Sequence, residues 1–370
     1  FMAPTELLAE QHFATLDAWL TPLGQPVAWL SGRTKGQARQ QVLQALASGD
    51  APLVVGTHAL FQHDVHFHRL GLIIVDEQHR FGVHQRLSLA DKGVGDEHPH
   101  QLALTATPIP RSLAMVAYGD LDCSVIDELP PGRQPVTTTL MDHTRRDAVM
   151  RRVGSACREG RQAYWVCTAI EESDTLDIEA AEATLDQLQQ ALPDVQIGLV
   201  HGKLKPAEKA TVMAAFKAGE IQLLVATTVI EVGVDVPNAS LMIIDNAERL
   251  GLAQLHQLRG RVGRGAVDSH CLLLYRQPLS DTAQQRLKVM QESHDGFVIA
   301  EADLEIRGPG ELLGTRQTGL AAFRIALLPE HEPLLVEAQD IAARLYARDP
   351  GRAKALMQRW AGARADFARV

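Results

Sequence analysis

Short apolar runs alternate with longer amphipathic segments along most of the chain. Runs of strand length occur at residues 27–30, 53–55, 72–75 and 102–104. Over residues 6–20 the apolar positions instead recur with helical spacing, and Thr5 is placed to cap the first turn of that helix. Apolar strands separated by helices are typical of a parallel sheet that is covered on both faces. The pattern therefore predicts an α/β domain over residues 1–130.

The alternation stops at residues 128–135, where three prolines and one glycine would interrupt a helix or a central strand. We interpret this segment as an interdomain linker. Beyond it, apolar runs of strand length resume at residues 163–167, 196–200, 223–226, 241–244 and 270–275. They predict a second α/β domain over residues 136–280.

After about residue 280 the strand-length runs cease and helical spacing continues. Residues 308–314, in which a proline lies between two glycines, are expected to interrupt two helical stretches. We predict a helical hairpin over residues 281–330 and a helical tail over residues 331–370. The tail is basic from Leu345 onward, which is typical of a solvated helix face and leaves a DNA-binding arm as the alternative.

Composition narrows the class of protein. Of the 370 residues, 46% are hydrophobic and 22% are charged, as in soluble globular proteins. No apolar run approaches the roughly 18 residues that cross a bilayer, and no signal-peptide pattern opens the chain, so a cytoplasmic location is expected. The net charge of −9 argues against unselective coating of DNA, but it allows a local basic track. The cysteines show no Cys-x-x-Cys spacing and are interpreted as buried thiols.

Asp76 and Glu77 follow directly after the apolar run at residues 72–75. In open α/β sheets ligands bind at the carboxyl ends of the strands. A carboxylate there can hold Mg²⁺ through water while a second one orients and deprotonates an attacking water. We assign these roles to Asp76 and Glu77, with a surface turn as the plainer interpretation.

Residues 257–264 contain three arginines and two glycines. On a helix, Arg261 and Arg264 would point from one face and could clamp a phosphate chain. A guanidinium could then neutralise the charge that develops on a γ-phosphoryl group. The alternative is a cationic surface helix, but glycines weaken a helix unless something packs closely against it.

Threonine and histidine side chains recur where the predicted strands end. Hydroxyl and backbone N–H groups at Thr5, Thr57, His58 and Thr228 could contact DNA phosphates without reading bases. Each of these residues could equally be a helix cap or a turn residue.

These segments, in order, resemble the motifs of superfamily 2 helicases. The resemblance is carried by residues 3–8, 76–79, 105–108, 227–235 and 257–264. It implies two RecA-like domains with parallel sheets, the first truncated at its start, and hydrolysis of ATP with Mg²⁺. By position it implies that Gln257 senses nucleotide together with Arg261 and Arg264, and that Gly233 and Asp235 line the interdomain cleft. It also implies DNA-binding or coupling roles for Pro4, Thr5, Thr57, His58, Thr105, Thr107 and Thr228.

Within that superfamily, residues 303–319 resemble the translocation motif shared by RecG-type and Mfd-type proteins. Residues 3–12 and Gln78 favour the RecG type. That resemblance implies movement on branched or forked double-stranded DNA, with remodelling of stalled replication forks and migration of Holliday junctions. Arg286, Arg307 and Gln317 match the positions that couple the motor to the duplex. For Arg307, an ordinary ion pair with Glu311 is the alternative.

One departure from the family is the absence of a Gly-x4-Gly-Lys-Ser/Thr phosphate loop in the 370 residues. The resemblance implies that the amino-terminal domain with which the family recognises branched DNA is also missing from these residues. We therefore expect that the isolated chain does not hydrolyse ATP, and that the first domain presents an uncovered sheet edge. Two alternatives stay open: an Mfd-type translocase, and a non-catalytic DNA-binding scaffold that retains the motor folds.

Overall fold

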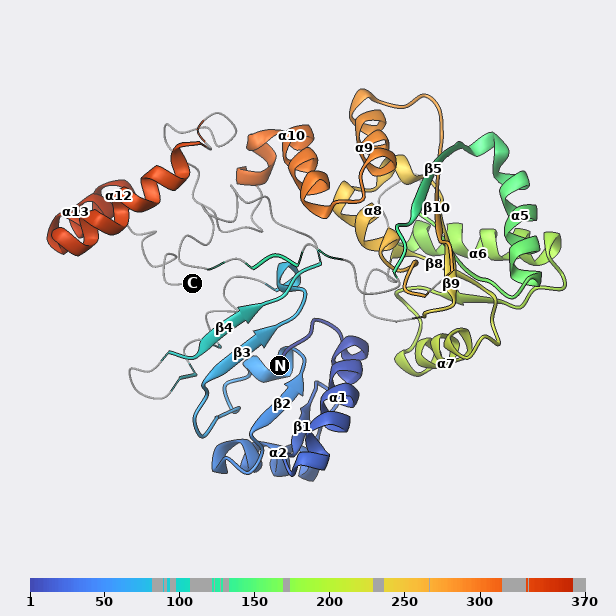
Figure 1. Ribbon diagram of the computed structural model, residues 1–370. Helices are drawn as coiled ribbons and strands as arrows, with labels where there is room; N and C mark the ends of the chain where they lie inside the picture. The colour runs from blue at the N-terminus through green and yellow to red at the C-terminus, as the bar shows by residue number, and fades with distance from the viewer. Residues whose placement is uncertain are drawn as a thin grey trace. The chain divides into compact units, whose positions relative to one another are not determined.

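The computed structural model describes residues 1–81, 89, 92–93, 98–106, 122, 124–126, 128, 133–168, 174–228, 236–265, 267–314, 331 and 333–361. The chain divides into two compact units (Figure 1), one built mainly from residues 1–106 and the other mainly from residues 123–307.

The sheet of the first unit consists of two parallel pairs joined by the first residues of the chain. The pairs are β1 (Val27–Leu30) with β2 (Leu53–Gly56), and β3 (Leu72–Val75) with β4 (His100–Ala103). Met2 forms bridges to both β2 and β3. Its N–H donates to the carbonyl of Ile74 at 2.8 Å, and its own carbonyl accepts from Asp76 N at 2.9 Å. Residues 1–3 therefore act as a central strand, which the hydrophobic pattern did not predict.

Two helices cover opposite faces of this sheet. Helix α1 (Glu6–Leu20) has the predicted bounds, and Leu8 N donates to the Thr5 hydroxyl at 3.4 Å, which confirms the cap. It packs on the face that carries Val55, whereas α2 (Gly36–Ser48) packs through Leu46 on the face that carries Val54. Successive side chains of a strand point to opposite faces, so adjacent valines serve the two layers. Short 3-10 turns follow at Thr21–Leu23, His58–Phe61 and Gln78–Arg80.

The second unit contains a six-stranded parallel sheet in the order β5-β10-β9-β6-β8-β7. The strands are β5 (Thr137–Asp142), β6 (Gln162–Val166), β7 (Ile197–Val200), β8 (Leu223–Ala226), β9 (Ala239–Ile244) and β10 (His270–Tyr275). All but β5 coincide with a predicted apolar run. β5 was missed because it lies at the sheet edge and begins with three threonines rather than apolar residues.

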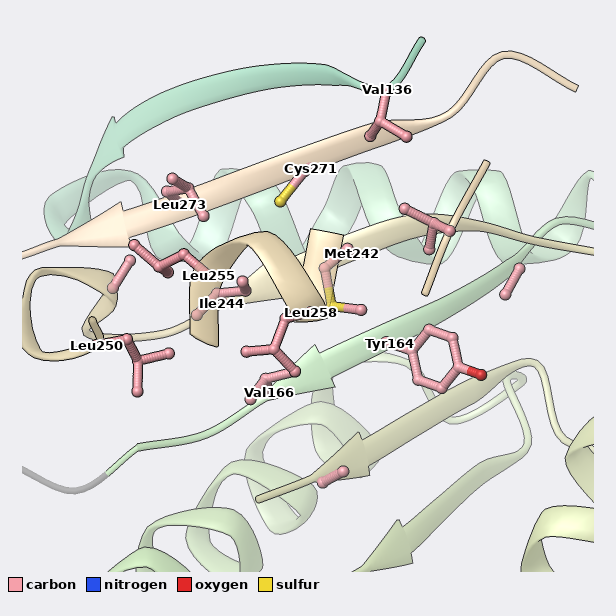
Figure 2. Close-up of a cluster of buried hydrophobic side chains, with 14 of the residues drawn as sticks. Val136, Tyr164, Val166, Met242, Ile244, Leu250, Leu255, Leu258, Cys271 and Leu273 are labelled. Carbon is pink, nitrogen blue, oxygen red and sulfur yellow. The ribbon is translucent and has the colours of Figure 1, made fainter. Parts of the chain in front are cut away.

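Helices bury both faces of this sheet. One apolar cluster joins Tyr164 and Met242 to the helices α7 (Pro206–Lys217) and α8 (Leu252–Arg259), as Figure 2 shows for α8. The other joins Trp165 to α5 (Arg146–Arg158) and α6 (Asp174–Ala191). Burial of each large apolar side chain stabilises the unit by about 1.5–3 kcal/mol. Three cysteines lie in these clusters as predicted, namely Cys157, Cys167 and Cys271, and burial raises their thiol pKa values to about 11, 12 and 12.

The described residues beyond 280 form helices: α9 (Asp281–Glu292), α10 (Gly296–Gly314), α12 (Leu334–Arg348) and α13 (Pro350–Ala361). Leu287, Met290 and Ile299 anchor α9 and the start of α10 in the same cluster as α8. The predicted interruption at residues 308–314 is wrong, since α10 continues to Gly314. Proline removes one helical hydrogen bond at a cost of about 3 kcal/mol, and the bonds on either side can still form. No helix in the described ranges is long and apolar enough to span a bilayer.

Candidate nucleotide and nucleic-acid site

Asp76 lies at the carboxyl end of β3, held by groups on either side. Its Oδ2 is 2.8 Å from Nε2 of His12 on α1, and its Oδ1 accepts from Glu77 N at 2.9 Å. The Asp76 side chain retains 19% of its exposure. The carboxylate is therefore oriented but still open to a ligand. His12 was not among the residues predicted from the sequence, although it lies in residues 3–12, which favour the RecG type.

Two predicted motifs of the first unit, residues 76–79 and the start of residues 105–108, lie side by side. Gln78 N donates to Leu104 O at 3.1 Å, and Leu104 N donates to Val75 O at 2.8 Å. This pairing brings the exposed Thr105 next to the turn that follows Asp76. Glu77 adopts a left-handed conformation with φ of 50°, an uncommon state for a residue with a side chain and one that is enriched at functional sites.

The residues predicted to contact DNA phosphates occupy different environments. Thr5 uses its hydroxyl as the α1 cap. Thr57 is only 1% exposed, so its hydroxyl does not face solvent, whereas the neighbouring His58 is exposed. Pro4 and Thr228 are half-buried. Thr5 and Thr57 follow adjacent strands, because Ala3 N donates to Gly56 O at 3.0 Å. A phosphate-binding role for this set stays a prediction.

The arginine-rich segment of the second unit is not one helix. Helix α8 ends at Arg259, and Gly260 caps it by donating its N–H to His256 O at 3.0 Å. Arg261 and Arg264 therefore lie beyond the helix, so the prediction that they share a helix face is wrong. The chain turns because Gly263 takes a left-handed φ of 77° and packs closely on Val136.

Around this segment, Gln257 and Arg261 are half-buried and Arg264 is exposed. Arg286, predicted to couple the motor to DNA, contacts the protein backbone. From α9, its Nη1 donates to Leu250 O at 2.8 Å and its Nη2 donates to Glu248 O at 3.1 Å. It thus holds the loop that leads into α8.

A pocket of about 1180 Å³, which was not predicted from the sequence, lies at the carboxyl ends of β5, β6, β9 and β10. Asp245 is one of the lining residues, and it accepts from Arg146 Nε at 3.0 Å and from Trp165 Nε1 at 3.1 Å. Burial lowers the pKa of the nearby His143 although the Asp245 carboxylate opposes that shift. Asp245 follows the apolar run 241–244 just as Asp76 follows 72–75, and that parallel was an available signal.

Several predicted site residues lie outside the described residues: Gly233, Asp235, Thr107 and Gln317. For Arg307 the structure describes the backbone, within α10, and not the side chain. Among the described residues, no group of three or more His, Cys, Asp or Glu side chains is placed to hold a metal ion.

Three family models match consecutive parts of the chain. Residues 1–116 match the DEAD/DEAH box helicase model, residues 145–266 match the helicase conserved C-terminal domain, and residues 293–359 match domain 3, C-terminal, of the ATP-dependent DNA helicase RecG. The chain is 64% identical over 361 residues to the ATP-dependent DNA helicase RecG of Escherichia coli strain K12.

The chain is similar to RecG-type helicases over almost its whole length. Its match to the E. coli protein covers 97% of this chain and 52% of that protein. A relative from Bacillus subtilis, also an ATP-dependent DNA helicase RecG, is 46% identical over 349 residues and covers 94% of this chain and 51% of its own length. The chain thus spans about half the length of these curated relatives. The match to the RecG domain 3 model favours the RecG type over the Mfd-type alternative.

A solved structure extends the likeness to three dimensions. The structure of RecG bound to a three-way DNA junction superposes on this chain with a TM-score of 0.69 at 43% sequence identity. The match covers 90% of this chain and 43% of the chain in the solved structure. The predicted fold class, two RecA-like α/β domains followed by helices, is confirmed.

Proposed function

We propose that this chain is the motor portion of an ATP-dependent DNA helicase that moves on branched double-stranded DNA in the cytoplasm. Remodelling of stalled forks and migration of Holliday junctions are the activities we assign to the whole protein. One observation carries the proposal. In a chain 64% identical to a RecG helicase, Asp76 and Glu77 occupy the carboxyl end of β3 beside Thr105, where an α/β motor places its hydrolytic groups.

The Asp76 carboxylate fits a role in holding Mg²⁺ through water. It is partly exposed, and His12 restricts its orientation. Mg²⁺ is commonly held by one or two carboxylates together with substrate phosphates. When bound, the ion would neutralise charge on the phosphates. Glu77, fixed by its left-handed backbone, is then the group that orients and deprotonates the attacking water.

The arginine-rich segment supplies the cations. Exposed Arg264 and half-buried Arg261 can each donate to phosphate oxygens, and Gln257 lies on the last turn of α8 just before them. We propose that these three residues sense the nucleotide. Arg286 then acts by holding the loop before α8 through the carbonyls of Glu248 and Leu250, rather than by touching DNA.

An ATPase assay with forked DNA tests the function. We expect this chain by itself to show background turnover, and a longer version that also carries the rest of the relatives' length to show turnover stimulated by forked DNA. In that longer version E77Q should lower the turnover number at least about 100-fold, since general-base contributions are of that order. The matched control is D64N, which removes an exposed carboxylate of the same unit. Full turnover in E77Q would refute the assigned role.

A further inference from the structure

Arg259 is the most deeply buried arginine of the arginine-rich segment. It lies at the last position of α8 and is 4% exposed. Its Nη1 donates to Ser293 O at 2.8 Å, to Met290 O at 2.9 Å and to the Thr138 hydroxyl at 3.3 Å. All of these contacts lie within the second unit. They connect α8 to β5 and to the point where α9 ends.

The two carbonyls are those that the end of a helix leaves without helical partners. Helix α9 ends at Glu292, and its last regular bond runs from Ser293 N to Val289 O. The carbonyl of Met290, one residue further on, therefore needs another donor. A cation at this position also interacts favourably with the negative end of the helix dipole. Arg259 thus caps α9 just before the chain enters α10 at Gly296.

Burying the Arg259 guanidinium costs free energy, because the charge loses its contact with water. Burial lowers the pKa of Arg259, and within the described ranges its hydrogen-bond partners are carbonyls and a hydroxyl rather than a carboxylate. A buried charge is tolerated only while its hydrogen bonds are made. The position of the Arg259 side chain and the position of the carboxyl end of α9 therefore depend on each other.

A second arginine makes the reciprocal contact, from α9 to the residues before α8. Arg286 on α9 donates to the carbonyls of Glu248 and Leu250, which precede α8. Both ends of α8 are thereby fixed to α9, and Leu258 and Leu287 pack between them in one apolar cluster. Gly260 and Arg261 follow Arg259 directly, so a shift of the α9 end must displace the residues just after α8.

We propose that Arg259 is a positioning residue that links the nucleotide-sensing segment, residues 257–264, to the junction between α9 and α10. A movement of either one is then transmitted to the other through the Arg259 guanidinium. The assignment of nucleotide sensing rests on the proposed function, whereas the mechanical link between the two segments does not.

Amide hydrogen exchange in this chain tests the link. The variants are R259Q and R259K, because lysine keeps the charge but not the planar fork of donors. The control R158Q removes an arginine of the same unit that is exposed and paired with Asp194. In R259Q we expect exchange to accelerate about tenfold in residues 260–264 and in residues 293–299, as for a local opening made easier. If R259Q does not fold, R259K should show the same pattern with smaller changes.

Acceleration confined to residues 293–299 would overturn the proposal, because Arg259 would then be only a helix cap. So would exchange that is unchanged in both segments. R158Q should change neither segment.

A second readout separates coupling from stability. In the longer version that hydrolyses ATP, the number of ATP molecules consumed per base pair moved should rise about fivefold in R259K, a size typical of altered coupling between sites. A parallel loss of hydrolysis and movement, or an unchanged ratio, would contradict the proposal. If the unsubstituted protein neither hydrolyses ATP nor moves on DNA, the proposed function fails, while the exchange experiment still decides the link.

Discussion

The substitution G263A should destabilise the second unit through two separable penalties. Gly263 has a φ of 77°, and a Cβ built there would lie 2.7 Å from Cγ2 of Val136. A left-handed conformation costs a residue with a side chain about 1–2 kcal/mol. Overpacking at a buried contact adds about 1–3 kcal/mol. The free energy of unfolding should therefore fall by roughly 2–5 kcal/mol.

Two companion variants separate these penalties. Gly219 has a φ of 81°, and no atom lies within 4 Å of the position that an added Cβ would take, so G219A should pay only the conformational cost. In the double variant V136A/G263A the overlapping methyl group is gone. The double-mutant cycle should therefore give a coupling energy of about 1–3 kcal/mol between the two positions.

Urea unfolding of the chain measures these free energies. Trp165 is fully buried in the second unit, and a background in which the other three tryptophans are replaced by phenylalanine isolates its fluorescence. A probe confined to one unit is needed because a chain of two units need not unfold in one step. Equal losses in G263A and G219A, or no recovery in V136A/G263A, would refute the steric reasoning.

Three further outcomes follow from individual contacts. T5A should lower the stability of the first unit by about 1 kcal/mol through loss of the helix cap, with T5S close to the unsubstituted chain in thermal unfolding. D245N should cost the second unit about 3 kcal/mol because the mostly buried Arg146 loses its carboxylate, whereas D194N, at an exposed pair, should cost less than about 1 kcal/mol in the same urea titration. Burial holds the pKa of His256 at about 4. The folded chain thus binds fewer protons than the unfolded chain between that value and about 6.5. The free energy of unfolding should fall as pH drops through this window, by at most roughly 3 kcal/mol, and H256Q should flatten the profile.

Much of the framework was predictable from local pattern. The strands at residues 27–30 and 223–226 are continuous apolar runs in parallel sheets, mostly half-buried in the first case and fully buried in the second, and α1 combines helical spacing with a capping threonine. In each case the information lies within one segment. The position of Asp76 after its strand belongs to the same class, because the carboxyl end of a parallel strand is defined by the run itself.

The elements that were missed or mistaken depend on partners far away in the chain. Residues 1–3 pair with β2 and β3 because Gly56 and Ile74 offer hydrogen bonds on both sides, and a pattern of three residues does not predict such pairing. The arginine-rich segment leaves the helix at Gly260. At position 263 a glycine is needed because Val136, just before β5, lies too close for a side chain. Local propensity favours several conformations here, and packing selects one of them.

The chemistry divides in the same way. Residue types and their order were enough to predict a motor similar to the RecG type, because carboxylates after a strand and clustered arginines can be recognised as motifs. Packing alone brought His12 to Asp76 across 64 residues, Arg259 to Met290 across 31, and Arg286 to Leu250 across 36. Such contacts are decided by which surfaces meet when helices dock on a sheet, and that outcome is a property of the whole fold rather than of any one segment.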